Sequence, residues 1–289
     1  MSAIWGHFVR LLGLGLIGGV ACTSDARASE CGGELPCQIE GGEYRIALPE
    51  GHDHADPLGR PLGAIMFLHG WRGSAAGEMN NGALRAVAEK YGLAFIAPQG
   101  AESTWSYPSS PSQHRDEFAY FSALMDDLKT RFGINSDRVL LSGFSMGGSM
   151  VWYLACEMPD RFGGFAPIAG AFWEPQPQSC SGPVDYMLHV HGTSDTVVPI
   201  NGRPIGDRWQ QGDVYRSFSM LETAGACAVN QPVSDPDAVR GLSCTMDWRC
   251  NGAGQTSMRL CLHDGGHIVR SEWLDTAWQQ LAATKGWDQ

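Results

Sequence analysis

The sequence predicts an α/β fold in which helices cover both faces of a mostly parallel central sheet. Apolar segments of strand length alternate with amphipathic segments of helix length along the chain. The strand segments are apolar throughout, as expected of parallel strands that are buried on both faces. No internal repeat or low-complexity linker divides the 289 residues, so we expect a single domain.

Strand and helix segments follow one another from residue 43 to the end of the chain. An apolar stripe formed by Ala83, Leu84, Val87 and Ala88 indicates a helix over 75–91. The expected strands are 43–51 as an edge strand, 62–70, 92–100, 137–145, 163–170, 184–192 and 257–267. The expected helices are 75–91, 117–133, 147–162, 213–227 and 271–286. A polar loop separates the first two strands.

The N-terminus has the features of an export signal. Arg10 precedes the apolar run 11–21, and the sequence "ARA" that ends at Ala28 has the small-x-small form that signal peptidase recognises. The apolar run is too short to span a bilayer as a helix, and no other apolar stretch is long enough. We therefore expect residues 1–28 to be a signal peptide, residues 29–289 to form the folded domain, and the protein to be secreted or periplasmic.

Two alternatives to a cleaved signal peptide stay open. One is an N-terminal helix that is not removed. The other is a lipoprotein anchored at Cys22, although Gly19 stands where such signals usually carry leucine. In either case the sequence offers no stable membrane span.

The chain is acidic, with a formal net charge of −11. An acidic protein repels the phosphate backbone of nucleic acids, and no cluster of basic residues reverses this balance. We therefore expect no nucleic-acid partner.

Nine cysteines agree with export, because disulfides form and persist in oxidising compartments. Without Cys22 an even number remains, which favours disulfides over the alternative of free buried thiols. We expect a local bond between Cys31 and Cys37, and Cys156 and Cys180 are candidates for a second. The last four are expected to pair among themselves: Cys227, Cys244, Cys250 and Cys261. Since no Cys-x-x-Cys pair occurs, a zinc site is not expected.

A Gly-x-Ser-x-Gly pattern at Gly143–Gly147 stands between a strand segment and a helix segment. In that context the pattern is typical of a nucleophile elbow, a sharp turn that holds a serine above the edge of a sheet. The following helix directs its N-terminal dipole at developing negative charge. We therefore expect Ser145 to be a nucleophile. The alternative is a tight turn that needs small residues only for packing.

A serine nucleophile needs a base, which a carboxylate orients. In this architecture the acid and then the histidine follow the serine along the chain. Asp195 and His267 each stand just past an apolar strand segment, at the same sheet edge as Ser145. We expect them to be the acid and the base. His263 is still within or barely outside its strand, and Asp185 begins a strand at the opposite edge, so both are weaker candidates.

Two backbone N–H groups are expected to bind the oxyanion that forms when the serine attacks. One belongs to Met146, directly after the nucleophile, and the other to Trp71, in the loop after an apolar strand. Trp105 and Trp173 also lie in segments at this edge, and we consider them substrate-binding candidates. The alternative is that these tryptophans are packing residues. No metal or organic cofactor is required.

Five stretches carry a resemblance to a known family: "FLHGWRGSA", "GFSMGG", "LACEMPDRFGGFAPIAG", "HVHGTSDTVVP" and "GGH". Over about residues 43–280 the chain resembles the α/β-hydrolase family of secreted esterases, which holds polyhydroxybutyrate depolymerases and feruloyl esterases. The resemblance implies that residues 29–289 form an α/β-hydrolase catalytic domain. It implies Ser145 as nucleophile, Asp195 as acid and His267 as base.

Two features depart from the family pattern. The stretch "GGHIVRSEW" lacks the Trp-Pro pair that often follows the histidine in family members. The sequence also carries no linker and separate polymer-binding domain of the kind found in many extracellular polyester depolymerases. The first departure concerns the pocket wall near His267. The second favours amorphous polymer, oligomers or small esters over crystalline polymer as the substrate.

We therefore expect an exported serine esterase that cleaves carboxylic esters through an acyl-enzyme, and specifically a polyhydroxybutyrate depolymerase-like hydrolase of polyesters or oligoesters. A feruloyl esterase that acts on hydroxycinnamoyl esters of plant polymers is the alternative. A peptidase or acyltransferase on the same fold is a further alternative. An inactive hydrolase-like binding module is the alternative of another class.

Overall fold

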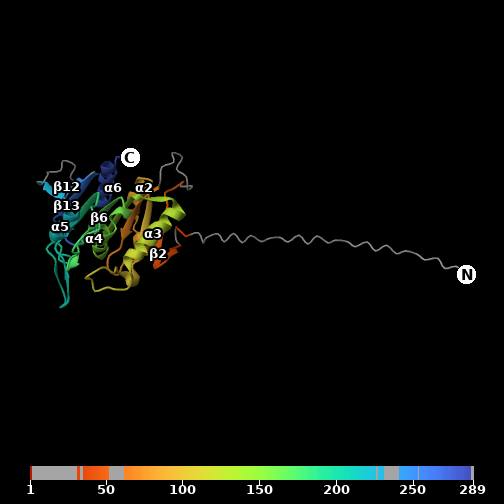
Figure 1. Cartoon of the computed structure of the whole chain (residues 1–289), viewed down its shortest axis with the longest axis horizontal. Helices are drawn as coiled ribbons and strands as arrows, with labels where there is room; N and C mark the ends of the chain where they lie inside the picture. Colours follow the sequence, from red (N-terminus) through yellow and green to blue (C-terminus); the bar gives the residue numbers. More distant parts are fainter. Residues whose placement is uncertain are drawn as a thin grey trace. The chain divides into compact units, whose positions relative to one another are not determined.

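The computed structural model describes residues 31–32, 35–51, 62–225, 227–230, 241–252 and 254–287, together with Met1 (Figure 1). The predicted cleavage site at Ala28, Cys22 and the predicted polar loop all lie outside the described residues. Within the described residues, no helix is both long and apolar enough to cross a bilayer.

Strands and helices alternate along most of the chain, as the apolar pattern predicts. The strands are β1 (Cys37–Ile39), β2 (Gly42–Ala47), β3 (Leu62–Leu68), β4 (Ala94–Pro98), β5 (Ile134–Phe144), β6 (Gly164–Ile168), β7 (Trp173–Glu174), β8 (Tyr186–Gly192), β9 (Arg203–Ile205), β10 (Trp209–Gln211), β11 (Cys227–Asn230), β12 (Ser243–Gly252) and β13 (Gly254–His263). The α-helices are α1 (Ala75–Met79), α2 (Gly82–Lys90), α3 (Glu117–Phe132), α4 (Met146–Glu157), α5 (Val214–Gly225) and α6 (Ser271–Lys285). Short 3-10 helices span Ala101–Ser103 and Pro159–Arg161.

In the described part of the chain, ten strands form one sheet in the order β1-β2-β4-β3-β5-β6-β8-β13-β12-β11. The central run from β4 to β13 is parallel, and the strands at both ends of the sheet pair antiparallel. The prediction of a mostly parallel sheet is confirmed. The predicted edge strand is β2, but β1 pairs outside it, so β2 lies one place in from the edge.

Both faces of the sheet are covered by helices, because the central strands are apolar on both faces (Figure 1). In β3, Met66 and Leu68 belong to a core with α3, α4 and α5, whereas Ile65 and Phe67 belong to a second core with α1, α2 and α6. Alternate residues of a strand point to opposite faces, so a strand with no polar position needs a helix layer on each side. The predicted layered α/β architecture is confirmed.

The predicted helix over 75–91 is wrong as a single helix, because the chain breaks at Asn80 and Asn81. The Asn81 side chain accepts a hydrogen bond from the Leu84 N–H at 3.3 Å and caps a new helix, α2. Asparagine favours such caps because its side chain replaces a missing backbone acceptor. The apolar stripe itself is confirmed at Leu84 and Val87, which are buried.

A small three-stranded sheet, in the order β7-β10-β9, was not predicted from the sequence. Its strands have two or three residues each, too few for a periodic pattern to be visible. The Arg203 guanidinium joins this sheet to the loop after β8 by donating to the Val197 carbonyl at 2.9 Å. The small sheet therefore lies against the loop that carries Asp195.

Disulfides join Cys31 to Cys37 and Cys156 to Cys180, so both of those predicted pairs are confirmed. A further disulfide joins Cys244 to Cys261, which agrees with pairing among the last four cysteines. In the ladder of β11 and β12, residues 227 and 250 are register partners. A bond between those two cysteines stays a prediction.

Candidate active site

Ser145 lies between the end of β5 and the start of α4, with φ 58° and ψ −117°. A positive φ is costly for any residue with a side chain, so the surrounding structure has to hold it. The Ser145 N–H donates to the Ile168 carbonyl at 3.0 Å, and the Ser145 carbonyl accepts from the Ser149 N–H at 2.8 Å. The backbone on both sides of the serine is therefore fixed.

The glycines around Ser145 allow the turn to pack against neighbouring strands. A Cβ on Gly147 would lie 2.2 Å from the Leu68 carbonyl oxygen, and one on Gly148 would lie 2.4 Å from the Ile168 carbonyl oxygen. Close packing explains the glycines, but it does not require a positive φ at the serine itself. The strained serine favours the nucleophile-elbow interpretation over the packing interpretation.

Asp195 and His267 form a hydrogen-bonded pair. The His267 Nδ1 lies 2.7 Å from Asp195 Oδ2, while Asp195 Oδ1 accepts from the N–H groups of Val197 and Val198 at 2.8 and 2.9 Å. Burial of Asp195 raises its pKa, but the hydrogen bonds from His267 and Val198 outweigh burial and lower it. An ionised carboxylate only accepts hydrogen bonds, so His267 carries its proton on Nδ1 and its Nε2 is free to act as a base.

Two contacts bring the remaining predicted site residues to this pair. The His267 ring lies 4.5 Å, centroid to centroid, from the ring of Phe144, the residue just before the predicted nucleophile. An ideal Cβ on Gly70 would lie 3.6 Å from the Ser145 Cβ, which puts the loop of Trp71 beside the elbow. The structure therefore gathers the nucleophile, acid, base and oxyanion-loop candidates at the carboxyl ends of the parallel strands.

The weaker sequence candidates lie elsewhere. His263 accepts from the Gly265 N–H at 3.0 Å and stacks on Trp273, with the ring centroids 4.7 Å apart. Asp185 pairs with Lys285 at the start of β8. Asp195 and His267 are hydrogen-bonded to each other, and their roles as acid and base stay a prediction.

Trp71 lies in a tight turn in which the Gly73 N–H donates to the Gly70 carbonyl at 3.0 Å. The turn is braced from behind by His69, which is fully buried. His69 Nε2 accepts from the Gly100 N–H at 3.0 Å, so Nδ1 carries the proton and donates to the Gly70 carbonyl at 2.8 Å. Burial lowers the pKa of His69, which keeps the imidazole neutral in this role.

The three site tryptophans differ in exposure. The Trp71 side chain is on the surface, with 63% of the residue exposed, and the Arg72 guanidinium lies 4.2 Å from its ring centroid. Trp105 is fully buried and donates from Nε1 to the His69 carbonyl at 2.8 Å. Trp173 is buried against Tyr107, with the ring centroids 6.1 Å apart. The expectation that Trp105 and Trp173 present faces to the substrate does not agree with this burial, and Trp105 instead supports the Trp71 loop.

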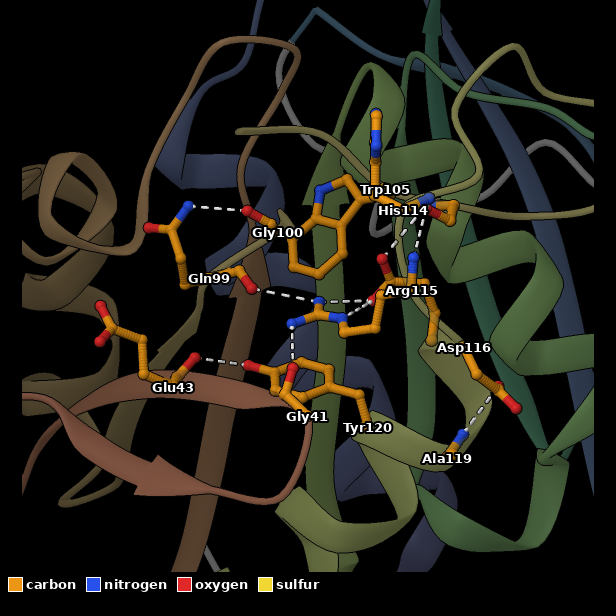
Figure 2. Close-up of polar contacts among 12 residues, drawn as sticks. Gly41, Glu43, Gln99, Gly100, Trp105, His114, Arg115, Asp116, Ala119 and Tyr120 are labelled. Atoms are coloured by element: carbon orange, nitrogen blue, oxygen red, sulfur yellow. Dashed lines mark hydrogen bonds and ion pairs between the residues drawn. The ribbon is translucent and has the colours of Figure 1, made fainter. Parts of the chain in front are cut away.

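A buried ion pair between Arg115 and Glu117 was not predicted. Figure 2 shows the Arg115 guanidinium between Gln99 and Gly41. The Arg115 guanidinium donates to Glu117 Oε2 at 2.5 and 3.1 Å, and to the Gly41 and Gln99 carbonyls at 3.1 Å each. Glu117 Oε1 accepts from the Ser106 N–H at 3.1 Å. The pair therefore ties both ends of the segment that carries Trp105. In the sequence these residues resemble ordinary charges at a helix start, and their carbonyl partners are distant in the chain.

No group of three His, Cys, Asp or Glu side chains that could hold a metal ion occurs among the described residues. The arrangement around Ser145 is instead suited to acyl transfer, because it combines a strained serine, a base oriented by a carboxylate and adjacent backbone N–H groups.

Residues 56–204 match the model of a family described as phospholipases and carboxylesterases. The chain belongs to this family. Among its relatives is a protein named "Putative esterase NocK" from Nocardia uniformis subsp. tsuyamanensis, which is 33% identical over 244 residues, or 78% of this chain and 69% of that protein. Feruloyl esterase C of Emericella nidulans is 28% identical over 176 residues.

The chain spans under two thirds of that feruloyl esterase, since the match covers 59% of it and 57% of this chain. A solved acetyl xylan esterase from Aspergillus awamori superimposes with a TM-score of 0.54 at 14% identity, over 83% of this chain and 94% of that one. At this identity the likeness shows the fold alone, which is the α/β-hydrolase fold. Family and relatives together identify the protein as an ester hydrolase.

Proposed function

We propose that the protein is an exported serine esterase in which Ser145, His267 and Asp195 act as a catalytic triad. The observation that carries the proposal is a histidine that donates to a buried carboxylate and whose ring contacts Phe144, the residue directly before the strained Ser145. Export is supported by the disulfides and by the leader pattern of the sequence.

In the proposed reaction, the Ser145 Oγ attacks the ester carbonyl while His267 Nε2 takes its proton. The N–H groups of Met146 and Trp71 stabilise the oxyanion of the tetrahedral intermediate. When the intermediate collapses, His267 returns the proton to the leaving alcohol, and an acyl-enzyme remains. Water activated by the same histidine then cleaves the acyl-enzyme and releases the acid.

For the substrate we favour hydroxycinnamoyl esters of plant polymers. Several relatives are named as feruloyl esterases, and one is named as an acetylxylan esterase joined to a xylanase. The exposed indole of Trp71, whose loop lies beside the nucleophile, provides a surface on which an aromatic acyl group can stack.

A polyhydroxybutyrate-like polyester or oligoester is the second candidate. It is favoured by exposed apolar side chains around the site: besides Trp71, Val197 is 45% exposed and Ile268 is 36% exposed, and they follow the acid and the base in the chain. An aliphatic polyester chain would contact such a rim without needing an aromatic group.

A release assay distinguishes the two substrates. The purified protein is offered methyl ferulate and amorphous polyhydroxybutyrate side by side, with the Ser145→Ala variant as the blank. We expect ferulate release. Release of hydroxybutyrate alone would move the assignment to the polyester hydrolases. Release of neither acid would contradict both substrate proposals.

Replacement of Trp71 by alanine is expected to raise KM for methyl ferulate about 2- to 13-fold, because one aromatic contact is worth about 0.5–1.5 kcal/mol. The backbone N–H remains, so kcat should change little. The matched control is Trp209→Ala, since Trp209 is also an exposed tryptophan but lies on β10. An unchanged KM for Trp71→Ala, or the same rise in both variants, would contradict a stacking role for Trp71.

A further inference from the structure

Two histidines of β8, His189 and His191, are fully buried on one face of the sheet behind the proposed acid. They play no part in the triad. The His189 ring packs against Trp152 of α4 and Phe218 of α5, with ring centroids 5.3 and 6.0 Å apart. The His189 imidazole is therefore fixed by packing. Its Nδ1 has no hydrogen-bond partner among the described residues, whereas its Nε2 and both nitrogens of His191 have partners within the protein.

The donor and acceptor in each hydrogen bond of these histidines can be assigned from the Val198 carbonyl. His191 Nε2 lies 2.7 Å from the Val198 carbonyl oxygen, which can only accept, so this nitrogen carries a hydrogen. Burial lowers the pKa of His191 and of His189, which makes both rings neutral. The His191 Nδ1 is then an acceptor, and it receives the hydrogen of His189 Nε2 at 2.9 Å.

This chain of hydrogen bonds ends on the loop that holds the proposed acid. Val198 receives the His191 hydrogen bond on its carbonyl and donates its own N–H to Asp195 Oδ1 at 2.9 Å. Because Val197 donates to the same oxygen, Oδ1 is occupied and Oδ2 is left to face His267. The other side of the loop is held by the Thr193 N–H, which donates to the His263 carbonyl at 2.8 Å, and by the Ser194 hydroxyl, which donates to the Asp264 carbonyl at 3.1 Å. The Arg203 guanidinium holds Val197 from the small sheet.

His191 also lies close to the carboxylate itself, with its Nε2 3.9 Å from Asp195 Oδ2. The positively polarised Nε2–H group of His191 is therefore near the carboxylate, although its hydrogen bond is made to the Val198 carbonyl. This position adds electrostatic support for the ionised acid in a buried, weakly screened site.

We propose that His191, held by His189, is a positioning residue for Asp195: it fixes the Asp195–Val198 loop so that one carboxylate oxygen faces His267. The proposal rests on the proposed triad. Loss of the His191 donor should misplace the acid and lower kcat while leaving substrate binding unchanged, because a small misplacement of a catalytic group slows the chemical step far more than binding.

The test uses substitutions that keep or remove the donor at the Nε2 position. His191→Gln keeps an amide N–H there, whereas His191→Asn places the amide nearer the backbone and His191→Leu removes it. We expect kcat for p-nitrophenyl acetate to fall roughly 10- to 100-fold in the Asn and Leu variants, with KM within about twofold, and to recover in the Gln variant.

The matched control is Ser142→Ala. Ser142 is also fully buried in the sheet and donates to a backbone carbonyl, that of Ala166 at 2.7 Å, but not to the acid loop. We expect this variant to lose some thermal stability and to keep its kcat. The melting temperature of every variant is measured, so that a loss of stability can be told from a loss of kcat. If the Leu variant does not fold, the comparison of the Asn variant with the Gln variant still tests the inference.

The outcomes separate this inference from the function it rests on. An unmodified protein that neither hydrolyses the ester nor reacts with a fluorophosphonate would overturn the triad, and the inference with it. An active unmodified protein whose Asn variant keeps full kcat would overturn only the inference. So would a Gln variant as slow as the Asn variant, or an equal loss of kcat in Ser142→Ala.

Discussion

Replacement of Ser145 by alanine is expected to lower kcat for carboxylic esters by about a million-fold, to the level that oxyanion binding alone supports. The hydroxyl oxygen of Ser145 is the atom that forms the acyl-enzyme, and alanine offers none in its place. Alanine fits the position, because its Cβ occupies the place of the serine Cβ, so the fold should be kept. The measurement is kcat for a p-nitrophenyl ester, together with the mass of the protein after reaction with a fluorophosphonate.

The control is Ser149→Ala, one turn further along α4. Ser149 is buried, whereas Ser145 is partly exposed, and the Ser149 side chain accepts from the Ala171 N–H at 3.3 Å. We expect the Ser149 variant to be labelled and to turn over ester, and the Ser145 variant to do neither. Labelling of the Ser145 variant would show that another residue is the nucleophile. An unmodified protein without labelling would support the binding-module alternative.

Replacement of Glu117 by alanine is expected to lower the free energy of unfolding by about 3–5 kcal/mol, because it leaves the buried guanidinium of Arg115 without its counter-charge. Only 11% of the Arg115 side chain and none of the Glu117 side chain is exposed. The substitution also leaves the Ser106 N–H without its acceptor. Urea unfolding followed by tryptophan fluorescence measures the change.

Asp116→Ala is the matched control for Glu117→Ala. Asp116 neighbours Glu117 and caps α3 by accepting from the Ala119 N–H at 3.1 Å, but its side chain is exposed (Figure 2). Loss of such a cap costs about 1 kcal/mol. If Glu117→Ala lowered the free energy of unfolding no more than Asp116→Ala does, the prediction that the buried ion pair stabilises the fold would be wrong.

The same variant should also affect turnover. Arg115 donates to the Gln99 carbonyl (Figure 2). The next residue, Gly100, donates to His69, which holds the turn of Trp71. If Arg115 loses its fixed position, the Gln99–Gly100 segment and His69 can shift, and the Trp71 N–H that we propose as an oxyanion donor shifts with them. We expect a lower kcat in Glu117→Ala even at temperatures where the variant is fully folded.

The sequence was sufficient to predict the residues that meet at the site, because each follows from local information. The pattern around Ser145 is contiguous, and Asp195 and His267 each come just after an apolar strand. Parallel strands that end at one edge bring such residues together whatever the intervening loops do. The structure adds the orientation, above all the Asp195–His267 hydrogen bond.

Burial in loops could not be predicted in the same way. Trp71 and Trp105 both follow strands and look equivalent in the sequence, yet one is exposed and the other has no exposed surface. Periodicity reports burial only in helices and strands, where side chains repeat at fixed angles. The break at Asn81 was missed because the apolar stripe, which begins at Ala83, does not show where its helix starts, and only the Asn81 cap marks the new helix.

The strand order has a consequence for how the protein folds. The loop of Asp195 is fastened to the end of β13 by hydrogen bonds from Thr193 to His263 and from Ser194 to Gly265. The proposed base follows β13 as well, so a chain released before that strand would hold the nucleophile but no base. Pairing of β13 with β8 is a long-range contact of the kind that forms slowly. In a refolding experiment, the recovery of turnover should therefore lag behind compaction and mark the docking of this last parallel strand.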